Sequence, residues 1–310
     1  MQKPTTRRAF LQQCLLTGGA AAGLGILSPQ PSRGIEPFRR PGAPRLRLSL
    51  AAYSFRDLLK HKDPAKRMTL FDFVDFCAEQ GLEGAELTSY YFPDPPDRDY
   101  LLQLRRHAFL RGVTVSGSAV GNNFVVAPGP ARDKQIADVK RWVDHCSVLG
   151  APHIRVFAGP TSPGLDLPTS KRLVVEALEE CAQYAGSRGI FLGLENHHGI
   201  VADPEDLLDI VRAVKSPWLG INLDTGNFYT DDPYADLAKC VPYAVNVQVK
   251  VDIRRRTDPK PSPADFKRLA GILRSANYQG WVALEYEAAE DPRAAVPRYL
   301  RELRAALEAR

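Results

Sequence analysis

From residue 46 to the end of the chain, short apolar runs alternate with longer segments whose apolar residues recur every three or four positions. Apolar runs of about four to eight residues are typical of buried strands, and the longer pattern is typical of helices that bury one face. The sequence therefore predicts a repeated strand–helix unit. The predicted strands are 48–54, 84–88, 113–118, 153–158, 190–195, 219–224, 244–250 and 281–286.

Several of the predicted helices carry start signals. The segments DPEDLLDIVRAV, SPADFKRLAGIL and DPRAAVPRYLRELRAAL each begin with Asp or Ser followed by Pro. Asp and Ser are favoured at a helix N-cap, and Pro is favoured at the first helical position. Pro297 lies inside the third segment, where its missing N–H and its ring predict a disturbance near the start of the last helix.

Eight strand–helix units of roughly 25–40 residues match a (β/α)8 TIM barrel, a fold for which about 250 residues is typical. An open doubly wound sheet is the rival architecture. No GxGxxG turn follows an early strand, which argues against its dinucleotide-binding form. We therefore expect a single-domain α/β TIM barrel over residues 46–310.

The N-terminal segment does not match this pattern. Residues 1–34 place Arg7 and Arg8 before the run CLLTGGAAAGLGIL, which resembles a twin-arginine export signal, and residues 35–45 read as a Pro/Arg-rich linker. The alternatives are an ordinary basic N-terminus or a retained membrane anchor, but the run is shorter than the roughly 20 residues that span a bilayer. The sequence predicts export, to the periplasm or its equivalent, and no membrane association once the signal is removed.

Charge and cysteine content narrow the function classes. Four of the 41 Lys and Arg residues lie in 1–34, which leaves 37 against 36 Asp and Glu residues. A nearly neutral body gives no reason to expect a nucleic-acid partner. Cys14 belongs to the signal. The other cysteines, which we expect to be buried free thiols because twin-arginine substrates fold before export, are Cys77, Cys146, Cys181 and Cys240.

Polar residues gather where the predicted strands end. A parallel barrel brings the carboxyl ends of all its strands to one rim, where the active sites of this architecture lie. Buried carboxylates that converge there are costly unless a positive charge lies among them, and a divalent cation is the simplest such charge. The residues at or near strand ends are Glu86, Arg155, Glu195, Asp224, Gln248, Lys250 and Glu285.

The predicted metal ligands are three carboxylates and one amide oxygen, from Glu195, Asp224, Gln248 and Glu285. An oxygen-only set suits Mn²⁺ or Mg²⁺ better than zinc. Side-chain alternation beyond Glu195 is expected to point Asn196 outward.

The motifs LGAPHIRVFAG, LENH, INLDTGN, VQVKVD and GWVALEYE, in this order, resemble the xylose isomerase-like TIM barrels of the sugar phosphate isomerase/epimerase group. The resemblance covers about residues 46–305. In the ketose 3-epimerases of this group, Glu, Asp, His and Glu of strands 5 to 8 hold a Mn²⁺-type ion. The resemblance thus implies that Glu195, Asp224 and Glu285 are metal ligands. The family histidine falls on Gln248, a weaker and uncharged ligand.

The resemblance also implies roles in catalysis. Glu195 and Glu285 would exchange a proton with the substrate carbon next to a carbonyl, through an enediolate that Lys250 helps to stabilise. His197, in the ENH motif, is expected to contact the substrate or transfer a proton, with a structural rim histidine as the alternative. The expected substrate is a small sugar or sugar derivative, and the protein could form an oligomer. The residues expected to bind substrate are Glu86, Arg155, Asn122 and Asn227.

Other functions stay open at this stage. The same chemistry serves a metal-dependent lyase or dehydratase acting on a keto-sugar or polyol, and a decayed site would leave a catalytically silent sugar-binding barrel. A DNA-repair endonuclease with the same fold would need a histidine-rich zinc site, and His61, His107 and His145 lie away from strand ends. The basic segment 252–263 is either an anion-binding loop or a solvated one. Tyr90, Tyr91 and Phe92 are either a sugar-stacking platform or ordinary packing.

Overall fold

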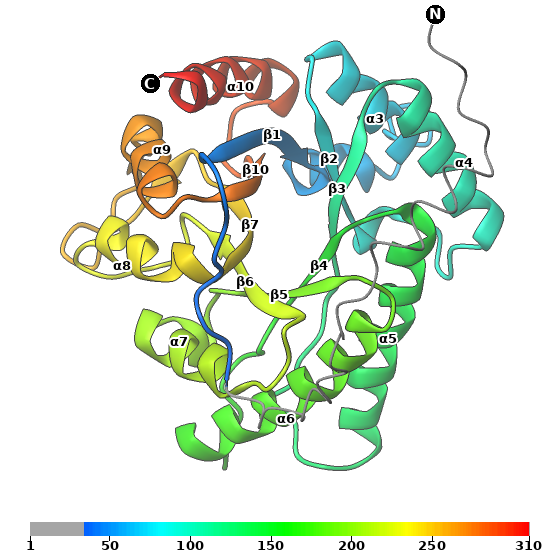
Figure 1. The fold of residues 1–310 in the computed structure, drawn as a ribbon. Coiled ribbons are helices and arrows are strands. Elements are labelled where there is room, and N and C mark those ends of the chain that lie inside the picture. The colour runs from blue at the N-terminus through cyan, green and yellow to red at the C-terminus, as the bar shows by residue number, and fades with distance from the viewer. Residues whose placement is uncertain (1–33, 310) are drawn as a thin grey trace, which may run out of the picture. The chain divides into compact units, whose positions relative to one another are not determined.

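A computed structural model describes residues 34–309 of the chain, in which eight parallel strands close into a barrel (Figure 1). The strands follow one another around the barrel in the order β1, β10, β7, β6, β5, β4, β3 and β2. The predicted TIM barrel is confirmed. The strands are β1 (Arg45–Ala51), β2 (Gly84–Thr88), β3 (Thr114–Ala119), β4 (His153–Val156), β5 (Phe191–Glu195), β6 (Leu219–Asp224), β7 (Ala244–Val249) and β10 (Gln279–Leu284).

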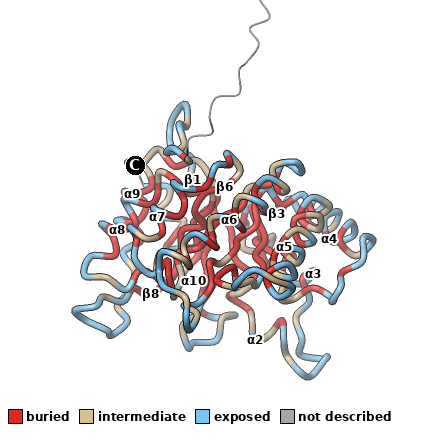
Figure 2. The backbone as a smooth tube through the Cα atoms, turned by 90° about the horizontal axis from the view of Figure 1, so that it is seen from below, coloured by how far each residue is buried: buried red, intermediate tan, exposed pale blue. Residues whose placement is uncertain are grey.

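Helices surround the barrel, and their apolar faces cover the strands (Figures 1 and 2). Asp side chains cap the N-termini of α4, α6, α7, α8, α9 and α10, as the Asp–Pro starts predict for α7 and α10. The predicted helix start at Ser262 is wrong, because Ser262 and Pro263 form a short strand and α9 begins after its cap Asp265. The α-helices are α2 (Arg56–Leu59), α3 (Leu70–Glu79), α4 (Arg98–Leu110), α5 (Pro130–Leu149), α6 (Leu167–Gly186), α7 (Pro204–Ala213), α8 (Pro233–Cys240), α9 (Phe266–Ser275) and α10 (Pro292–Glu308).

Short elements complete the loops at the two ends of the barrel. Strands β8 (Asp252–Ile253) and β9 (Ser262–Pro263) pair antiparallel and form the stem of the basic loop that follows β7. The 3-10 helices are η1 (Ala52–Phe55), η2 (Ser89–Tyr91), η3 (Gly199–Val201) and η4 (Val241–Tyr243).

Several predicted details differ from the structure. The predicted strand 153–158 ends at Val156, and the predicted strand 281–286 ends at Leu284, one residue before Glu285. β1 ends at Ala51, because the chain turns into η1, where the Ser54 hydroxyl donates to the carbonyl oxygen of Leu284 and accepts from the N–H of Tyr286. α10 continues through Pro297 as one helix. Proline removes one backbone hydrogen bond there, while the buried side chains of Val296 and Leu300 hold the helix to the barrel on both sides of it.

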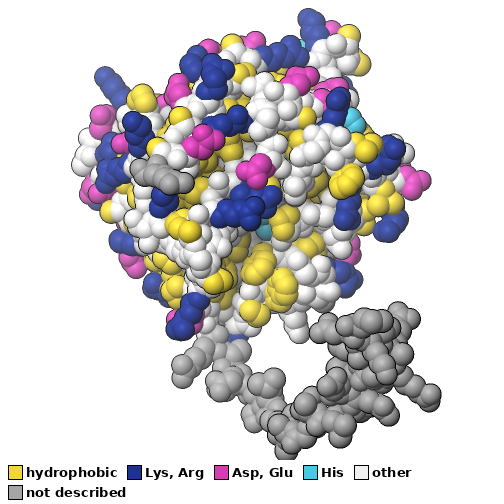
Figure 3. All heavy atoms as spheres, turned by 45° about the horizontal axis from the view of Figure 1, so that its top comes forward, with side chains coloured by type: hydrophobic (Ala, Val, Ile, Leu, Met, Phe, Trp, Pro, Cys, Tyr) yellow, Lys and Arg dark blue, Asp and Glu magenta, His cyan; other side chains and the backbone are white. Residues whose placement is uncertain are grey.

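The state of the cysteines agrees with the prediction from the sequence. The four cysteines of the described residues are all buried free thiols, as predicted, and Cys14 lies outside those residues. Within the described chain no helix is both long enough and apolar enough to cross a membrane. On the face drawn in Figure 3, basic and acidic side chains are interspersed.

The segment predicted as a linker packs against the amino-terminal ends of the strands. The N–H of Phe38 donates to the carbonyl oxygen of Pro242, and its ring lies edge-on to Phe191. Asn277 donates to the carbonyl oxygen of Arg40. These contacts place residues 34–44 across the end of the barrel opposite to the predicted active site. The predicted export signal lies outside the described residues.

Candidate active site at the carboxyl ends of the strands

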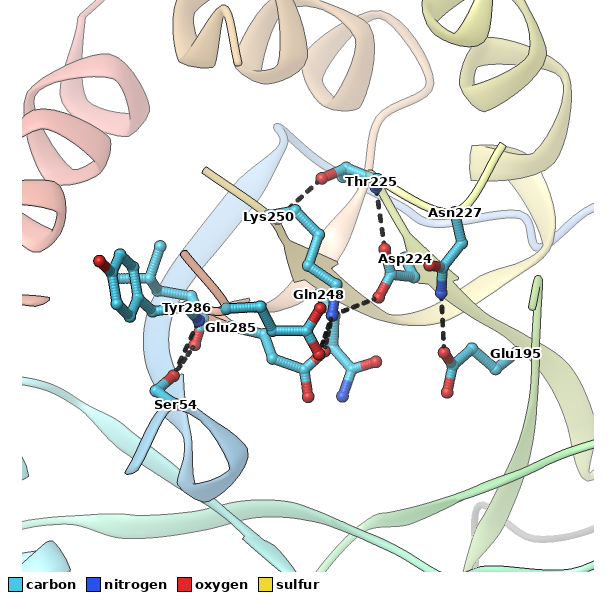
Figure 4. A network of polar contacts seen from close by, with 12 residues as sticks. Ser54, Glu195, Asp224, Thr225, Asn227, Gln248, Lys250, Glu285 and Tyr286 are labelled. Carbon is cyan, nitrogen blue, oxygen red and sulfur yellow. Dashed lines mark hydrogen bonds and ion pairs between the residues drawn. The ribbon is translucent and has the colours of Figure 1, made fainter. Parts of the chain in front are cut away.

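Lys250 lies at the centre of the carboxylate group. Its ammonium nitrogen is 2.5 Å from Oε2 of Glu285 and 3.1 Å from Oδ2 of Asp224 (Figure 4). Lys250 follows the last residue of β7, between the strands that carry the two acids, and its side chain is 11% exposed. Asp224, Lys250 and Glu285, which the sequence places at or near strand ends, are therefore in contact.

Glu195 reaches the same end of the barrel, which we call the mouth, from β5. Its Oε2 lies 2.8 Å from Nε of Arg155, and its Oε1 accepts a hydrogen bond from Nδ2 of Asn227 at 3.0 Å. The Arg155 guanidinium stacks on the Phe157 ring at 3.8 Å from its centroid. Arg155 and Asn227, both predicted to contact substrate, thus hold Glu195 in place.

A second polar network lies beneath the carboxylates. Alternation along β6 and β7 points Asn222 and Asn246 into the barrel, one layer below Asp224 and Gln248. The Gln248 amide donates to Oε1 of Glu86 at 2.5 Å and accepts from Asn222 at 2.6 Å. Asn246 donates to Oε2 of Glu86 and to Oδ1 of Asn222, at 2.8 Å each.

Two residues predicted to belong to the site take part in this network. The amide oxygen of Gln248 is turned toward Asn222, and its role as a fourth metal ligand stays a prediction. Glu86 is 0% exposed and both of its oxygens accept hydrogen bonds from β7, and its role in substrate binding likewise stays a prediction. A buried carboxylate that accepts two amide donors offsets part of its desolvation cost.

Asn122, which was predicted to bind substrate, forms a link between strand ends in this structure. Its amide donates to the carbonyl oxygen of Phe157 and accepts from the Phe157 N–H, both at 2.8 Å. Thr225 makes a comparable link, since its hydroxyl oxygen accepts from the N–H of Lys250 and its own N–H donates to the carbonyl oxygen of Gln248. These side chains join the ends of neighbouring strands. Asn122 therefore braces the rim, and it also lines the small cavity beside His197.

His197 lies in an aromatic group. Its ring centroid is 4.7 Å from that of Phe157 and 4.1 Å from that of His198, and the three side chains line a cavity of about 100 Å³. Burial, with the neighbouring His198 as the next cause, lowers the pKa of His197 to about 4. A neutral imidazole beside the mouth can donate or accept a hydrogen bond, but the described contacts do not join it to the carboxylates.

The electrostatics of the mouth are dominated by burial. Burial raises the pKa of Glu195 to about 8, against the opposing effect of Arg155, and raises that of Asp224 to about 7, against the effect of Lys250. Burial alone would lower the pKa of Lys250, but Asp224 and Glu285 outweigh it and hold this pKa well above the ordinary value. Lys250 is therefore a fixed positive charge and not a base.

A cavity of about 420 Å³ opens beside this group. Arg254 lines it, although the sequence did not distinguish Arg254 from the other arginines of the segment 252–263. Alternation along β8 turns Ile253 into the core and leaves Asp252 and Arg254 on the cavity side. Arg255 lies over the ring of Tyr234 and Arg256 pairs with Asp231, so these two arginines anchor the loop. The lining residues include Asn227, Lys250, Asp252, Arg254 and Glu287.

The aromatic residues after β2 divide into two roles. Phe92 is buried against Tyr100 and Trp142, which is ordinary packing. The Tyr90 hydroxyl lies 3.5 Å from Nη1 and from Nη2 of Arg155, so Tyr90 belongs to the wall of the mouth.

A divalent cation fits the carboxylate group in charge and in ligand type. Three buried acids, Glu195, Asp224 and Glu285, outnumber the two buried cations Arg155 and Lys250. Oδ2 of Asp224 is buried and makes no hydrogen bond, and its ion-pair contact is the Lys250 ammonium. Carboxylate oxygens are ligands for hard cations. Among residues 34–309, no three acid, histidine or cysteine side chains are already closed around one metal-sized point. Arg155 and Lys250 hold the oxygens instead.

Comparison with known proteins identifies the family. The family model described as "Xylose isomerase-like TIM barrel" matches residues 74–306, which is most of the chain. The chain belongs to this family. The resemblance seen in the motifs is thereby confirmed at the level of the family.

Individual relatives of the xylose isomerase-like barrel are distant in sequence. Inosose dehydratase of Histophilus somni is 23% identical over 273 residues, which cover 75% of this chain and 86% of that protein. The crystal structure of a 3-keto-D-glucoside 4-epimerase from E. coli has a TM-score of 0.65 at 18% identity and covers 84% of this chain and 100% of its own. The crystal structure of the IolI protein with a bound zinc atom has a TM-score of 0.67 at 15% identity, with coverage of 84% and 96%. At these identities the solved structures establish the fold alone.

Proposed function

We propose that the protein is a divalent-metal-dependent sugar isomerase or epimerase. The observation that carries the proposal is the contact of Lys250 with Asp224 and Glu285, with Glu195 held by Arg155 at the same end of the barrel. The three acids lie at the carboxyl ends of neighbouring strands, beside a cavity of about 420 Å³. A sugar epimerase among the structures of the same fold, and zinc in another, support this choice. The substrate class is a small keto-sugar or a sugar derivative.

The proposed cation is held by the carboxylates of Glu195, Asp224 and Glu285, and the oxygen-only set favours Mn²⁺ or Mg²⁺. When bound, such an ion polarises a substrate carbonyl and acidifies the neighbouring C–H. Glu285 or Glu195 removes that proton and returns it, to the opposite face for epimerisation or to the neighbouring carbon for isomerisation. The Lys250 ammonium donates a hydrogen bond to the oxygen that gains negative charge.

A dehydratase is the second candidate, because inosose dehydratase of Histophilus somni is similar over 75% of this chain. Its first step is the same proton abstraction. The electron pair left on carbon then expels a hydroxyl group from the next carbon, and water leaves after that hydroxyl takes up a proton. The two functions therefore differ in product and not in the first base.

The test is NMR of keto-sugars and inososes incubated in D₂O with the Mn²⁺-loaded full chain. Deuterium at a carbon next to the carbonyl is expected, with an epimer or isomer as product. Deuterium incorporation accompanied by loss of water would assign the dehydratase. No incorporation with any of these substrates, with Mn²⁺ or with Mg²⁺, would overturn both enzyme assignments and favour a sugar-binding barrel without catalysis.

We also propose that residues 1–34 direct export through the twin-arginine pathway, to the periplasm or its equivalent. The support is the Arg7–Arg8 pair ahead of a short apolar run. The test replaces both arginines by lysine and compares the periplasmic and cytoplasmic fractions of a host with this pathway. Retention of the variant in the cytoplasm is expected, and equal export of both proteins would overturn the proposal.

A further inference from the structure

The Lys250 ammonium contacts three carboxylates, and they differ in position. Those of Asp224 and Glu285 are buried and belong to the proposed cation site. The third belongs to Glu287, whose Oε1 lies 3.1 Å from the ammonium nitrogen, and whose side chain is 43% exposed and lines the cavity. An ammonium group has three N–H donors, so each carboxylate can receive one.

A dication and this ammonium compete for the same oxygens. A cation bound to Oδ2 of Asp224 and Oε2 of Glu285 at about 2.0–2.6 Å would lie close to a nitrogen that is itself 3.1 Å and 2.5 Å from those atoms. Two positive charges at such a separation in a buried site repel strongly. Entry of the dication therefore requires the ammonium to leave the position between Asp224 and Glu285.

The end of the Lys250 side chain can move while its base stays in place. Cγ of Lys250 packs directly on Gly226, where a Cβ would lie only 2.6 Å from it, and the flexible stem beyond Cγ leads to the cavity that Lys250 lines. Glu287 remains as an anionic partner on the cavity side after the other two contacts are lost. The charge of Lys250 is then neutralised in either position.

We propose that Lys250 is a built-in competitor for the divalent cation, and that Glu287 holds the displaced ammonium at the edge of the cavity. The inference rests on the proposed function only in taking Asp224 and Glu285 as cation ligands. Cation binding thereby turns Lys250 toward the bound sugar. The apparent affinity for the cation is reduced by the fraction of molecules in which Lys250 occupies the centre.

The first test measures binding of Mn²⁺ alone to the full chain, by titration calorimetry and by the EPR signal of free Mn²⁺. Lys250→Met is expected to bind Mn²⁺ about tenfold more tightly than the wild type, because the competitor is gone. Lys171→Met is the matched control, since Lys171 also pairs with two carboxylates, Asp206 and Asp209, but on the helical surface. It is expected to leave the affinity unchanged. Equal or weaker binding by Lys250→Met overturns the inference.

The second test isolates Glu287. Glu287→Gln is expected to weaken Mn²⁺ binding about threefold in the wild type, because the displaced ammonium loses its partner, and to have a clearly smaller effect in the Lys250→Met background. Equal weakening in both backgrounds would mean that Glu287 acts through its charge alone, and would overturn its assigned role. Lys250→Gln, with circular dichroism as the folding control, replaces Lys250→Met if the latter does not fold.

The binding tests and the exchange test can fail separately. Deuterium exchange that needs Mn²⁺, together with unchanged affinity in Lys250→Met, would overturn this inference and leave the proposed function intact. Tighter Mn²⁺ binding by Lys250→Met without exchange on any sugar would support the inference and overturn the proposed reaction.

Discussion

The side chain of Asn196 forms two hydrogen bonds with the backbone of Asp224. Its Nδ2 donates to the Asp224 carbonyl oxygen at 2.8 Å, and its Oδ1 accepts from the Asp224 N–H at 2.8 Å. Both residues are 0% exposed. Asn196 directly follows Glu195, the last residue of β5, so this pair of bonds fixes the end of β5 against the end of β6. It thereby holds two of the predicted metal ligands, Glu195 and Asp224, next to each other.

Removal of this link is expected to destabilise the protein. Asn196→Ala leaves a buried N–H and a buried carbonyl group of Asp224 without partners, and each such group costs about 1–3 kcal/mol. We expect the free energy of unfolding to fall by about 2–4 kcal/mol in urea denaturation, and the affinity for Mn²⁺ to fall with it. Asn122→Ala, which breaks the comparable link to Phe157, serves as a control that lowers stability but spares the carboxylates. A loss below about 0.5 kcal/mol for Asn196→Ala would show that the link is not significant.

The sequence predicts the barrel and the ends of its strands because these depend on local periodicity. Glu195 and Asp224 are the last residues of β5 and β6, as predicted, and a parallel barrel then brings them together. Asn196 was predicted to point outward by strand alternation. That rule does not apply there, because β5 ends at Glu195 and the next residue turns to cap the neighbouring strand.

The partners of buried side chains could not be predicted in the same way. Gln248 and Glu86 are 162 positions apart in the chain, and nothing local in either strand indicates that the amide turns down to that carboxylate. A signal was nevertheless present, because VNVQV alternates two amide residues with valines, which places both inside the barrel. Buried amides need partners, and in this barrel the buried Glu86 provides one.

Loss of a proposed base is expected to abolish proton exchange. Glu285→Gln keeps the shape of the side chain and its contact with Lys250, but an amide cannot accept the substrate proton. We expect the rate of deuterium incorporation to fall at least about 100-fold, since general base catalysis is typically worth 10²–10⁴. The measurement is the same NMR assay in D₂O. Glu290→Gln is the control, because Glu290 pairs with Arg298 at the surface. Exchange by Glu285→Gln at the wild-type rate would exclude Glu285 as a base.

The ion pair between Arg155 and Glu195 should make stability depend on pH. Arg155→Met keeps much of the packing on Phe157 but leaves the Glu195 carboxylate buried without its cation. Burial raises the pKa of Glu195 to about 8. At pH 9 the wild-type carboxylate of the metal-free protein is charged and paired with Arg155, whereas loss of Arg155 raises the Glu195 pKa further and the variant keeps the proton. We therefore expect the variant to lose about 1.4 kcal/mol more stability at pH 9 than at pH 6. At pH 6 the carboxyl group carries a proton, and the loss should be clearly smaller. Equal losses at both pH values would show that Arg155 acts through packing only.

The buried carboxyl group of Glu86 is expected to lower the stability of the metal-free protein as pH rises. Burial, with Glu285 as the next cause, raises the pKa of Glu86 from its ordinary value of 4.5 to about 7. The folded state therefore keeps a proton on Glu86 at pH values where the unfolded chain has lost it. The resulting stability is fully present below pH 4.5 and is lost as pH rises through about 7.

Glu86→Gln tests this assignment, because glutamine cannot ionise. We expect the free energy of unfolding of the wild type to fall relative to the variant by about 3 kcal/mol in total between pH 4.5 and 7.5, at up to about 1.4 kcal/mol per pH unit. Urea denaturation in the presence of EDTA at several pH values measures the difference. The buried His153, whose pKa burial lowers to about 4, contributes a slope of opposite sign. Nε2 of His153 lies 4.0 Å from Oε2 of Glu86, so the substitution also changes the surroundings of His153. The His153 slope lies between about pH 4 and 6.5, and the comparison above pH 6.5 therefore isolates Glu86. Parallel stability curves for the two proteins would mean that Glu86 stays ionised in the fold, with its charge carried by the two amide donors of β7.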